Sequence, residues 1–153
     1  MDNKAIGVKK SMNYALAYAI LALCGGVFYR EFTRFNDFSG VTALGKIHTH
    51  FFLLGMFMYL IIALFARHYD LYSMKTFKSF RGIYNTGVPM TGIMLGFRGV
   101  FDVLPEKLTR GADKAISGIA GIGHILTGVG IILLIISLKK AAVSEKTETK
   151  STT

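Results

Sequence analysis

The chain has 153 residues, the length of a single domain, and 52% of them are hydrophobic, with a mean hydropathy of +0.45. This composition is too apolar for a soluble domain of that size, and a lone cysteine, Cys24, excludes an internal disulfide. The formal net charge of +9 does not call for a nucleic-acid partner, because basic loops beside an anionic lipid surface account for it. We therefore predict a protein whose main partner is the lipid bilayer and which binds no nucleic acid.

Four stretches with few or no charges are each long enough to cross the roughly 30 Å of bilayer hydrocarbon as a helix. They lie near residues 11–29, 47–66, 82–104 and 115–138. The predicted fold is all-α, a polytopic membrane four-helix bundle over residues 1–140. The remaining segment, 141–153, is polar and low in complexity, which predicts a disordered tail.

The orientation follows from the positions of Lys and Arg, which concentrate on the cytoplasmic side of membrane proteins. With the N-terminus inside, the inner segments carry eleven of the 18 basic residues and the outer loops carry seven. The outer seven are partly offset by five carboxylates. We predict that both termini are cytoplasmic and that the protein is a multi-pass protein of the cell membrane.

The first apolar segment ends at Arg30, and the second begins within "GKIHTHFFLLGMF" (45–57). At about 100° per residue, His48 and His50 point about 200° apart on a helix. The His48 side carries small residues and a phenol, which predicts packing against protein and leaves an interhelical hydrogen bond as the alternative to ligation. The His50 side carries Leu53, Leu54 and Phe57, so His50 is expected at the headgroups or at a subunit interface.

The third segment contains Pro89, and we expect a kink there, with Asn85, Thr86 and Thr91 available for the freed carbonyls. Gly92 and Gly96 in the same segment predict close helix packing. Arg98 stands at the outer end. It either extends to the interface or binds carboxylates such as haem propionates, and Arg30 is a second candidate for that role.

The fourth segment holds His124 within "SGIAGIGHILTGVG". Small residues share its helical face, and they are Ser117, Ala120, Gly121, Thr127 and Gly128. Such a face either admits another backbone or leaves a flat slot for a planar ligand that His124 would ligate. An ionisable side chain at that depth is a functional candidate, with a packing hydrogen bond as the alternative. His68, beside Arg67 and Asp70, is expected to be a solvated loop residue.

The stretch "HTHFFLLGMF" resembles a helix of the haem–copper oxidase catalytic subunit. In that family the two histidines of a His-x-His span face opposite ways, and each ligates the iron of a different haem. The resemblance implies haem ligation by His48 and His50, and a four-span chain would match one of the three four-helix arcs of that subunit. The family's His-Pro-Glu-Val signature and His-His pair are missing here, so oxygen reduction by a monomer is not implied. Over nearly its whole length, with "GGVFYREFTRF" (25–35), the chain also resembles an uncharacterised family of short four-span bacterial membrane proteins.

We interpret the sequence as a membrane protein that binds b-type haem through His48 and His124, with His50 as a third candidate, for electron transfer or gas sensing. The alternative is copper or another metal held by the same histidines with methionines, which are Met56, Met58, Met90 and Met94. A structural or accessory protein without a cofactor is the third interpretation. No catalytic motif is present, so we do not predict an enzyme, and a part in an oxidoreductase stays open. We expect a homo-oligomer, a trimer or a dimer.

Overall fold

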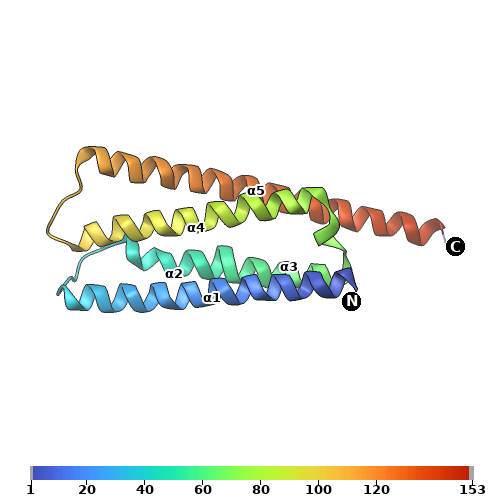
Figure 1. Ribbon diagram of the computed structural model, residues 1–153, viewed down its shortest axis with the longest axis horizontal. Helices are drawn as coiled ribbons and strands as arrows, with labels where there is room; N and C mark the ends of the chain where they lie inside the picture. The colour runs from blue at the N-terminus through green and yellow to red at the C-terminus, as the bar shows by residue number, and fades with distance from the viewer. Residues whose placement is uncertain (1, 152–153) are drawn as a thin grey trace.

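A computed structural model describes the backbone of residues 2–151 and the side chains of residues 2–143. It is an all-α structure of four helical rods (Figure 1). The first is α1 (Asn3–Phe35), the third α4 (Lys75–Val103) and the fourth α5 (Arg110–Ser151). The second rod is continuous but mixed, and runs through η1 (Ala43–Lys46), α2 (Ile47–His50), the π-helix η2 (Phe51–Phe57) and α3 (Met58–His68). A short turn, η3 (Leu71–Ser73), leads into α4.

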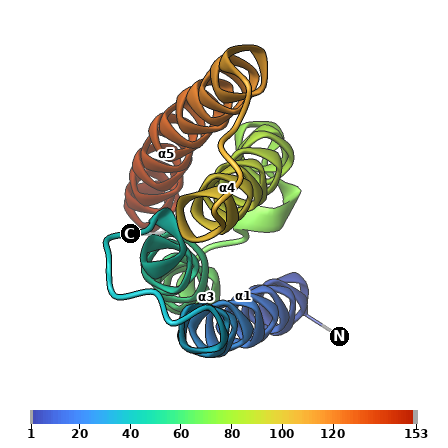
Figure 2. The ribbon, with the colours of Figure 1, turned by 90° about the vertical axis from the view of Figure 1, so that its left-hand side faces the viewer.

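The rods follow one another as an open arc rather than a closed square. Seen end on, α4 lies between α5 and the α2–α3 rod, and α1 lies on the far side of that rod (Figure 2). The extensive contacts join α5 to α4, α4 to the second rod, and the second rod to α1. The chain runs up and down, so both described ends lie at the same end of the bundle, which we call the terminal end (Figure 1).

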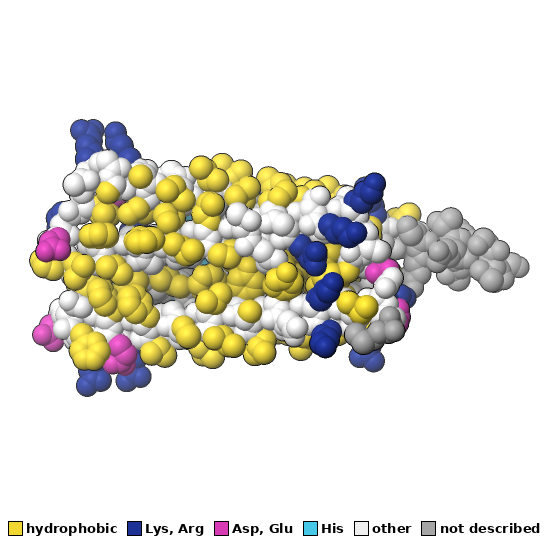
Figure 3. Space-filling model, in the orientation of Figure 1, with side chains coloured by type: hydrophobic (Ala, Val, Ile, Leu, Met, Phe, Trp, Pro, Cys, Tyr) yellow, Lys and Arg dark blue, Asp and Glu magenta, His cyan; other side chains and the backbone are white. Residues whose placement is uncertain are grey.

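Three of the rods are long and apolar enough to cross a membrane: Asn3–Phe35, Ala43–His68 and Arg110–Val143. Figure 3 shows apolar side chains along the middle of the molecule and basic side chains at both ends. This supports a membrane protein. The rod that contains predicted span 82–104 is not among the three, since α4 carries cations near its start and Arg98 and Asp102 near its end. The four-span topology and the orientation of the termini stay predictions.

Helix α5 continues to Ser151, beyond the start of the predicted disordered tail at 141–153. Side chains from residue 144 onward, and residues 152–153 entirely, lie outside the described part of the chain. The disordered tail therefore stays a prediction.

Glycines of α4 bring it close to the second rod. A Cβ at Gly92 would collide with the ring of Phe51, and one at Gly99 would collide with Leu44. A Cβ at Gly96 would lie 3.7 Å from Cδ1 of Ile47, which is an ordinary contact. The expected role of Gly92 and Gly96 in close packing thus applies to the interface between α4 and the second rod.

The π-helix η2 directly follows His50, and nothing in the sequence analysis anticipated it. Gly55, within η2, leaves room for the ring of Tyr18 on α1, which a Cβ would strike. The carbonyl of Leu54 accepts a hydrogen bond of 2.7 Å from the hydroxyl of Tyr84 on α4. Single π turns inside helices are rare and often lie at functional sites. Because a π turn contains more residues than an α turn, the side chains beyond the His-x-His pair point in other directions than they would on a regular α-helix.

Polar side chains in the middle of the bundle bond across helices. Asn85 of α4 accepts from the Tyr18 hydroxyl at 2.9 Å and donates to the Tyr59 hydroxyl at 2.6 Å. Asn85 therefore joins α1 to α3 through α4, whereas we expected it to serve carbonyls freed by Pro89. The Thr86 hydroxyl donates to the carbonyl of Gly82, and the Thr91 hydroxyl is buried without a hydrogen-bond partner.

Candidate functional site

The two histidines of the His-x-His pair have different neighbours, as their spacing predicts. His48 faces α1, where a Cβ at Gly26 would lie 3.7 Å from the Cβ of His48. Its Nδ1 atom is buried and has no hydrogen-bond partner. His50 instead faces α5, and its ring centroid lies 6.3 Å from that of His124, with the ring planes at 89°. The second rod thus separates the two imidazoles.

The hydrogen bonds of His50 and His124 fix which ring nitrogen is free. The Nδ1 atom of His50 lies 2.9 Å from the carbonyl of Lys46, and that of His124 lies 2.8 Å from the carbonyl of Ala120. A carbonyl oxygen only accepts, so Nδ1 carries the proton in each neutral ring. The lone pair is then on Nε2, which is the arrangement of a metal-ligating imidazole whose other nitrogen donates to a backbone carbonyl.

The pair lies beside the middle of α4. Phe51, next to His50, packs on Gly92, and a Cβ at Gly123, next to His124, would lie 2.6 Å from Oγ1 of Thr91. From Gly92 to the end of α4 at Val103 is about 16 Å of helix. His50 thus meets α5 of its own chain, and the expectation that it lies at the headgroups or against a second subunit stays a prediction.

The small residues near His124 divide into two groups. Gly123 and Thr127 pack against α4, where a Cβ at Gly87 would lie 2.6 Å from the backbone nitrogen of Thr127. Thr127 is therefore part of the α4–α5 contact and not of an open slot. Gly121 and Gly128 have open space where a side chain would stand, with nothing within 4 Å. The flat, open surface predicted beside His124 consists of these two glycines.

Arg98 stands on the same side of the bundle as His124, nearer the end opposite the termini. One of its guanidinium nitrogens donates to Oδ1 of Asp113 at 2.6 Å and to Oγ of Ser117 at 2.7 Å. Its side chain is 39% exposed, so the guanidinium keeps free donors. Ser117 and His124 are two turns apart on α5, about 10 Å along the axis. Arg98 can therefore reach a ligand that extends along α5 from His124.

The other candidate residues, Arg30 and His68, lie away from the His50–His124 pair. Arg30 is exposed on α1, where its Nε lies 3.6 Å from a carboxylate oxygen of Glu31, and the second rod separates α1 from α5 (Figure 2). His68 is exposed, and it is the last residue of α3 rather than the loop residue we expected. Among the described residues there is no group of three or more His, Cys, Asp or Glu side chains that could hold a metal ion. The structure therefore brings His50 and His124 together and places His48 apart from them.

We did not predict from the sequence that His50 lies beside His124, because we had paired His48 with His124. Residue spacing gave the opposite directions of His48 and His50. It could not show which of them meets α5, because that depends on how the second rod is rotated against α4. The glycine-rich surface of α5 was the one sequence signal for the site, and it identified His124.

A family model described as a protein of unknown function (DUF2871) matches residues 8–141. The match covers most of the chain, so the chain belongs to this family. No curated protein and no solved structure matches it. This confirms the resemblance to an uncharacterised family, while its four spans and bacterial origin stay predictions, and the comparisons give no support to the resemblance to haem–copper oxidases.

Proposed function

We propose that this DUF2871 protein is an integral membrane protein that binds one b-type haem between α2 and α5, with His50 and His124 as axial ligands. Electron transfer or gas sensing is the use that such a centre would serve. The observation that carries the proposal is the distance of 6.3 Å between the two imidazole centroids.

That distance fits two imidazoles on opposite sides of one metal ion. A ligating imidazole nitrogen lies about 2.0 Å from the metal, and the ring centre lies about 1.1 Å further back, so the two centroids would be about 6 Å apart. Both rings also have Nδ1 engaged with a backbone carbonyl, which leaves both Nε2 atoms as donors to a metal.

The number of ligands favours haem over the copper alternative. Haem iron takes four ligands from the macrocycle and needs the protein for axial positions only, so two histidines are sufficient. A protein-built site for copper or zinc needs about three or four side-chain ligands. In the described part of the chain, no group of three or more His, Cys, Asp or Glu side chains includes His50 and His124, so a copper site there would also need methionine sulfur as a ligand.

The surroundings fit a planar, apolar group with an acidic edge. Gly121 and Gly128 leave space along α5 next to His124, and Leu53 and Phe57 present exposed apolar side chains on the second rod. Arg98 would bind a propionate carboxylate through a charge-assisted hydrogen bond. His50 and His124 would hold the iron in place. The apolar surroundings would raise the free-energy cost of a net charge on the haem.

Finer aspects of the proposal rest on the sequence. A location in a bacterial cytoplasmic membrane with both termini inside rests on the distribution of Lys and Arg. A trimer or a dimer is proposed from the oxidase resemblance alone, because His50 now has a partner within its own chain. The Nδ1 atom of His48 is buried beside α1 without a hydrogen-bond partner, so it could bind a second group there.

The test is the visible spectrum of the purified protein with its haem content. We expect about one haem per chain and a low-spin spectrum with sharp reduced-state bands. His50→Ala and His124→Ala should each abolish or convert that spectrum, because each removes one axial ligand. His68→Ala is the matched control and should leave haem content and spectrum unchanged, since His68 is exposed at the end of α3.

The same samples separate the two uses. A reduced spectrum unaffected by carbon monoxide indicates that both axial positions are held for electron transfer, and displacement of one histidine indicates gas sensing. Haem content that survives both His50→Ala and His124→Ala would refute the site. Stoichiometric copper without haem bands would support the metal-handling alternative instead.

A further inference from the structure

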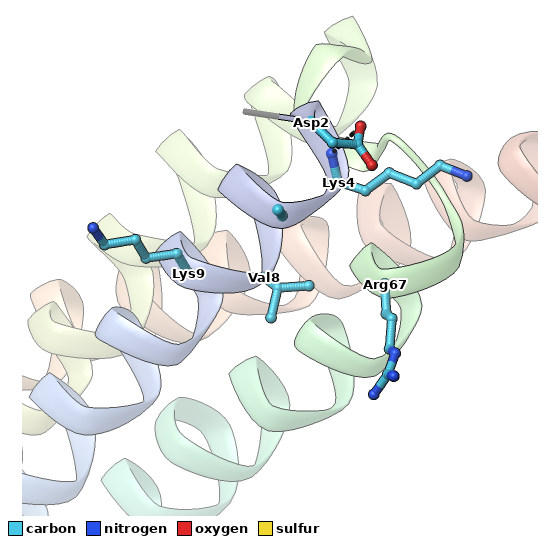
Figure 4. Close-up of a pocket in the computed structure, with 6 residues that line it drawn as sticks. Asp2, Lys4, Val8, Lys9 and Arg67 are labelled. Carbon is cyan, nitrogen blue, oxygen red and sulfur yellow. Dashed lines mark hydrogen bonds between the residues drawn. The ribbon is translucent and has the colours of Figure 1, made fainter.

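A recess lies between the first turns of α1 and the last turn of α3, at the terminal end of the bundle. Its volume is about 460 Å³, and its lining residues are Asp2, Lys4, Ala5, Val8, Lys9 and Arg67. Figure 4 shows Lys4 and Val8 extending from α1 on the side of α3, the Arg67 side chain extending from α3 away from Lys4, and Lys9 on the opposite flank of α1. Arg67 also borders a second recess of about 700 Å³. Arg67 therefore lines both recesses.

The first recess has an excess of positive charge. Lys4, Lys9 and Arg67 come from two helices, and Asp2 is the one carboxylate in the lining. Asp2 already accepts a hydrogen bond of 3.3 Å from the backbone N–H of Lys4, as the N-cap of α1. Within the described residues, none of the three cations has a carboxylate within ion-pair distance.

Other cations at the terminal end are differently placed. The ammonium of Lys10 lies 5.8 Å from the ring centroid of Tyr72, and the guanidinium carbon of Arg81 lies 5.0 Å from it. These distances are those of cation–π contacts. Lys10 and Arg81 are thus engaged with an aromatic ring, whereas among the described residues no such contact is found for Lys4, Lys9 or Arg67.

Apolar surface continues from the cationic recess toward the middle of the bundle. Met12 and Leu16 follow Val8 at helical spacing on α1 and are exposed. Leu64, about one turn before Arg67 on α3, and its neighbour Phe65 are exposed as well. Leu64, Phe65 and Tyr69 also line the second recess. A ligand for this surface should therefore have an anionic head and a long apolar tail.

We propose that this surface is a binding site for an anionic phospholipid of the adjoining leaflet. Lys4 and Arg67 bind the phosphate from the two facing helices, Lys9 adds charge at the rim, and the acyl chains lie over Met12, Leu16 and Leu64. Lysine and arginine are the side chains that bind phosphate, and basic pockets between membrane helices are known to take anionic headgroups. The bound lipid would join the start of α1 to the end of α3.

The proposal does not depend on the haem proposal, because the site shares no residue with the His50–His124 pair. The test uses the full-length protein in mild detergent and measures binding of phosphatidylglycerol and of phosphatidylcholine by native mass spectrometry. We expect wild-type protein to retain phosphatidylglycerol preferentially. Lys4→Gln with Arg67→Gln should weaken that binding about tenfold or more, since two basic side chains near the phosphate are lost.

The matched control is Lys75→Gln with Lys78→Gln, which removes the same charge from the start of α4 at the same end of the bundle. Its affinity for phosphatidylglycerol should stay within about twofold of wild type, and circular dichroism should show that both double variants keep their helicity. Equal losses in the two double variants would overturn the site in favour of diffuse attraction. So would equal retention of the two lipids by wild-type protein. Competition by inorganic phosphate at the affinity of the lipid would overturn the part assigned to the acyl chains.

Discussion

Asn85 offers a direct test of what holds the arc of helices together. It bonds Tyr18 of α1 and Tyr59 of α3 at 2.9 and 2.6 Å, and both tyrosines are almost fully buried. Asn85→Leu keeps the number and branching of the side-chain heavy atoms and removes both hydrogen bonds. Each such bond inside a membrane protein contributes about 0.6 kcal/mol on average and at most about 1.7 kcal/mol. For two bonds we expect a loss of about 1–3 kcal/mol in the free energy of unfolding.

Asn85 is half-buried, which favours the lower part of that range, about 1–2 kcal/mol. A loss of about 1.4 kcal/mol lowers the ratio of folded to unfolded protein tenfold. The measurement is reversible unfolding in mixed micelles, followed by circular dichroism. Thr86→Val is the matched control, because the Thr86 hydroxyl donates within its own helix and bridges no other rod.

A second variant distinguishes hydrogen bonding from packing. When both partners of a buried hydrogen bond become apolar, the cost of an unpaired group disappears. Adding Tyr18→Phe and Tyr59→Phe to Asn85→Leu should therefore restore part of the lost stability. If Asn85→Leu unfolds like wild type, or if the two added changes lower stability further, the reasoning that this network joins the helices is wrong.

Three further predictions concern the helix crossing, the arginine and the topology. Gly87→Leu should separate α4 from α5 and lower stability by about 1–3 kcal/mol, whereas Gly118→Ala, where space is open, should not destabilise the protein; the same unfolding measurement compares them. Arg98→Gln should change stability by less than about 1 kcal/mol, because its ion pair is exposed, yet lower haem occupancy in a haem titration; unchanged occupancy would remove Arg98 from the site. A reporter fused after Phe38 should read external and one at Thr76 cytoplasmic, and the reverse result would invert the predicted topology.

The sequence by itself determined the class of the protein and the approximate positions of its helices. The four predicted apolar segments coincide with helical rods of the structure, the third running one residue past the end of α4. Three of those rods are apolar and long enough for a membrane. Each helix could be predicted from its own stretch of sequence. Backbone N–H and C=O groups in hydrocarbon must form hydrogen bonds within the segment, and a long apolar segment does so as a helix. The opposite directions of His48 and His50 could also be predicted from the sequence, because they follow from the angle between successive residues of a helix.

The tertiary structure decided which side chains meet. His50 faces His124 because Gly92 and Gly99 bring α4 against the second rod, and Gly87 and Gly123 bring α5 against α4. Residue spacing gives directions within one helix, but the rotation and depth of one helix against another depend on contacts between residues far apart in the chain.

The same limit applies to the other features that the sequence did not reveal. The π-helix, the bridge made by Asn85 and the recess beside Arg67 each involve contacts between different rods. Helices in hydrocarbon gain little from burying apolar surface, so their arrangement is set by close packing at small residues and by a few hydrogen bonds. Such contacts leave no periodic pattern in the sequence, and for that reason the structure was needed to find them.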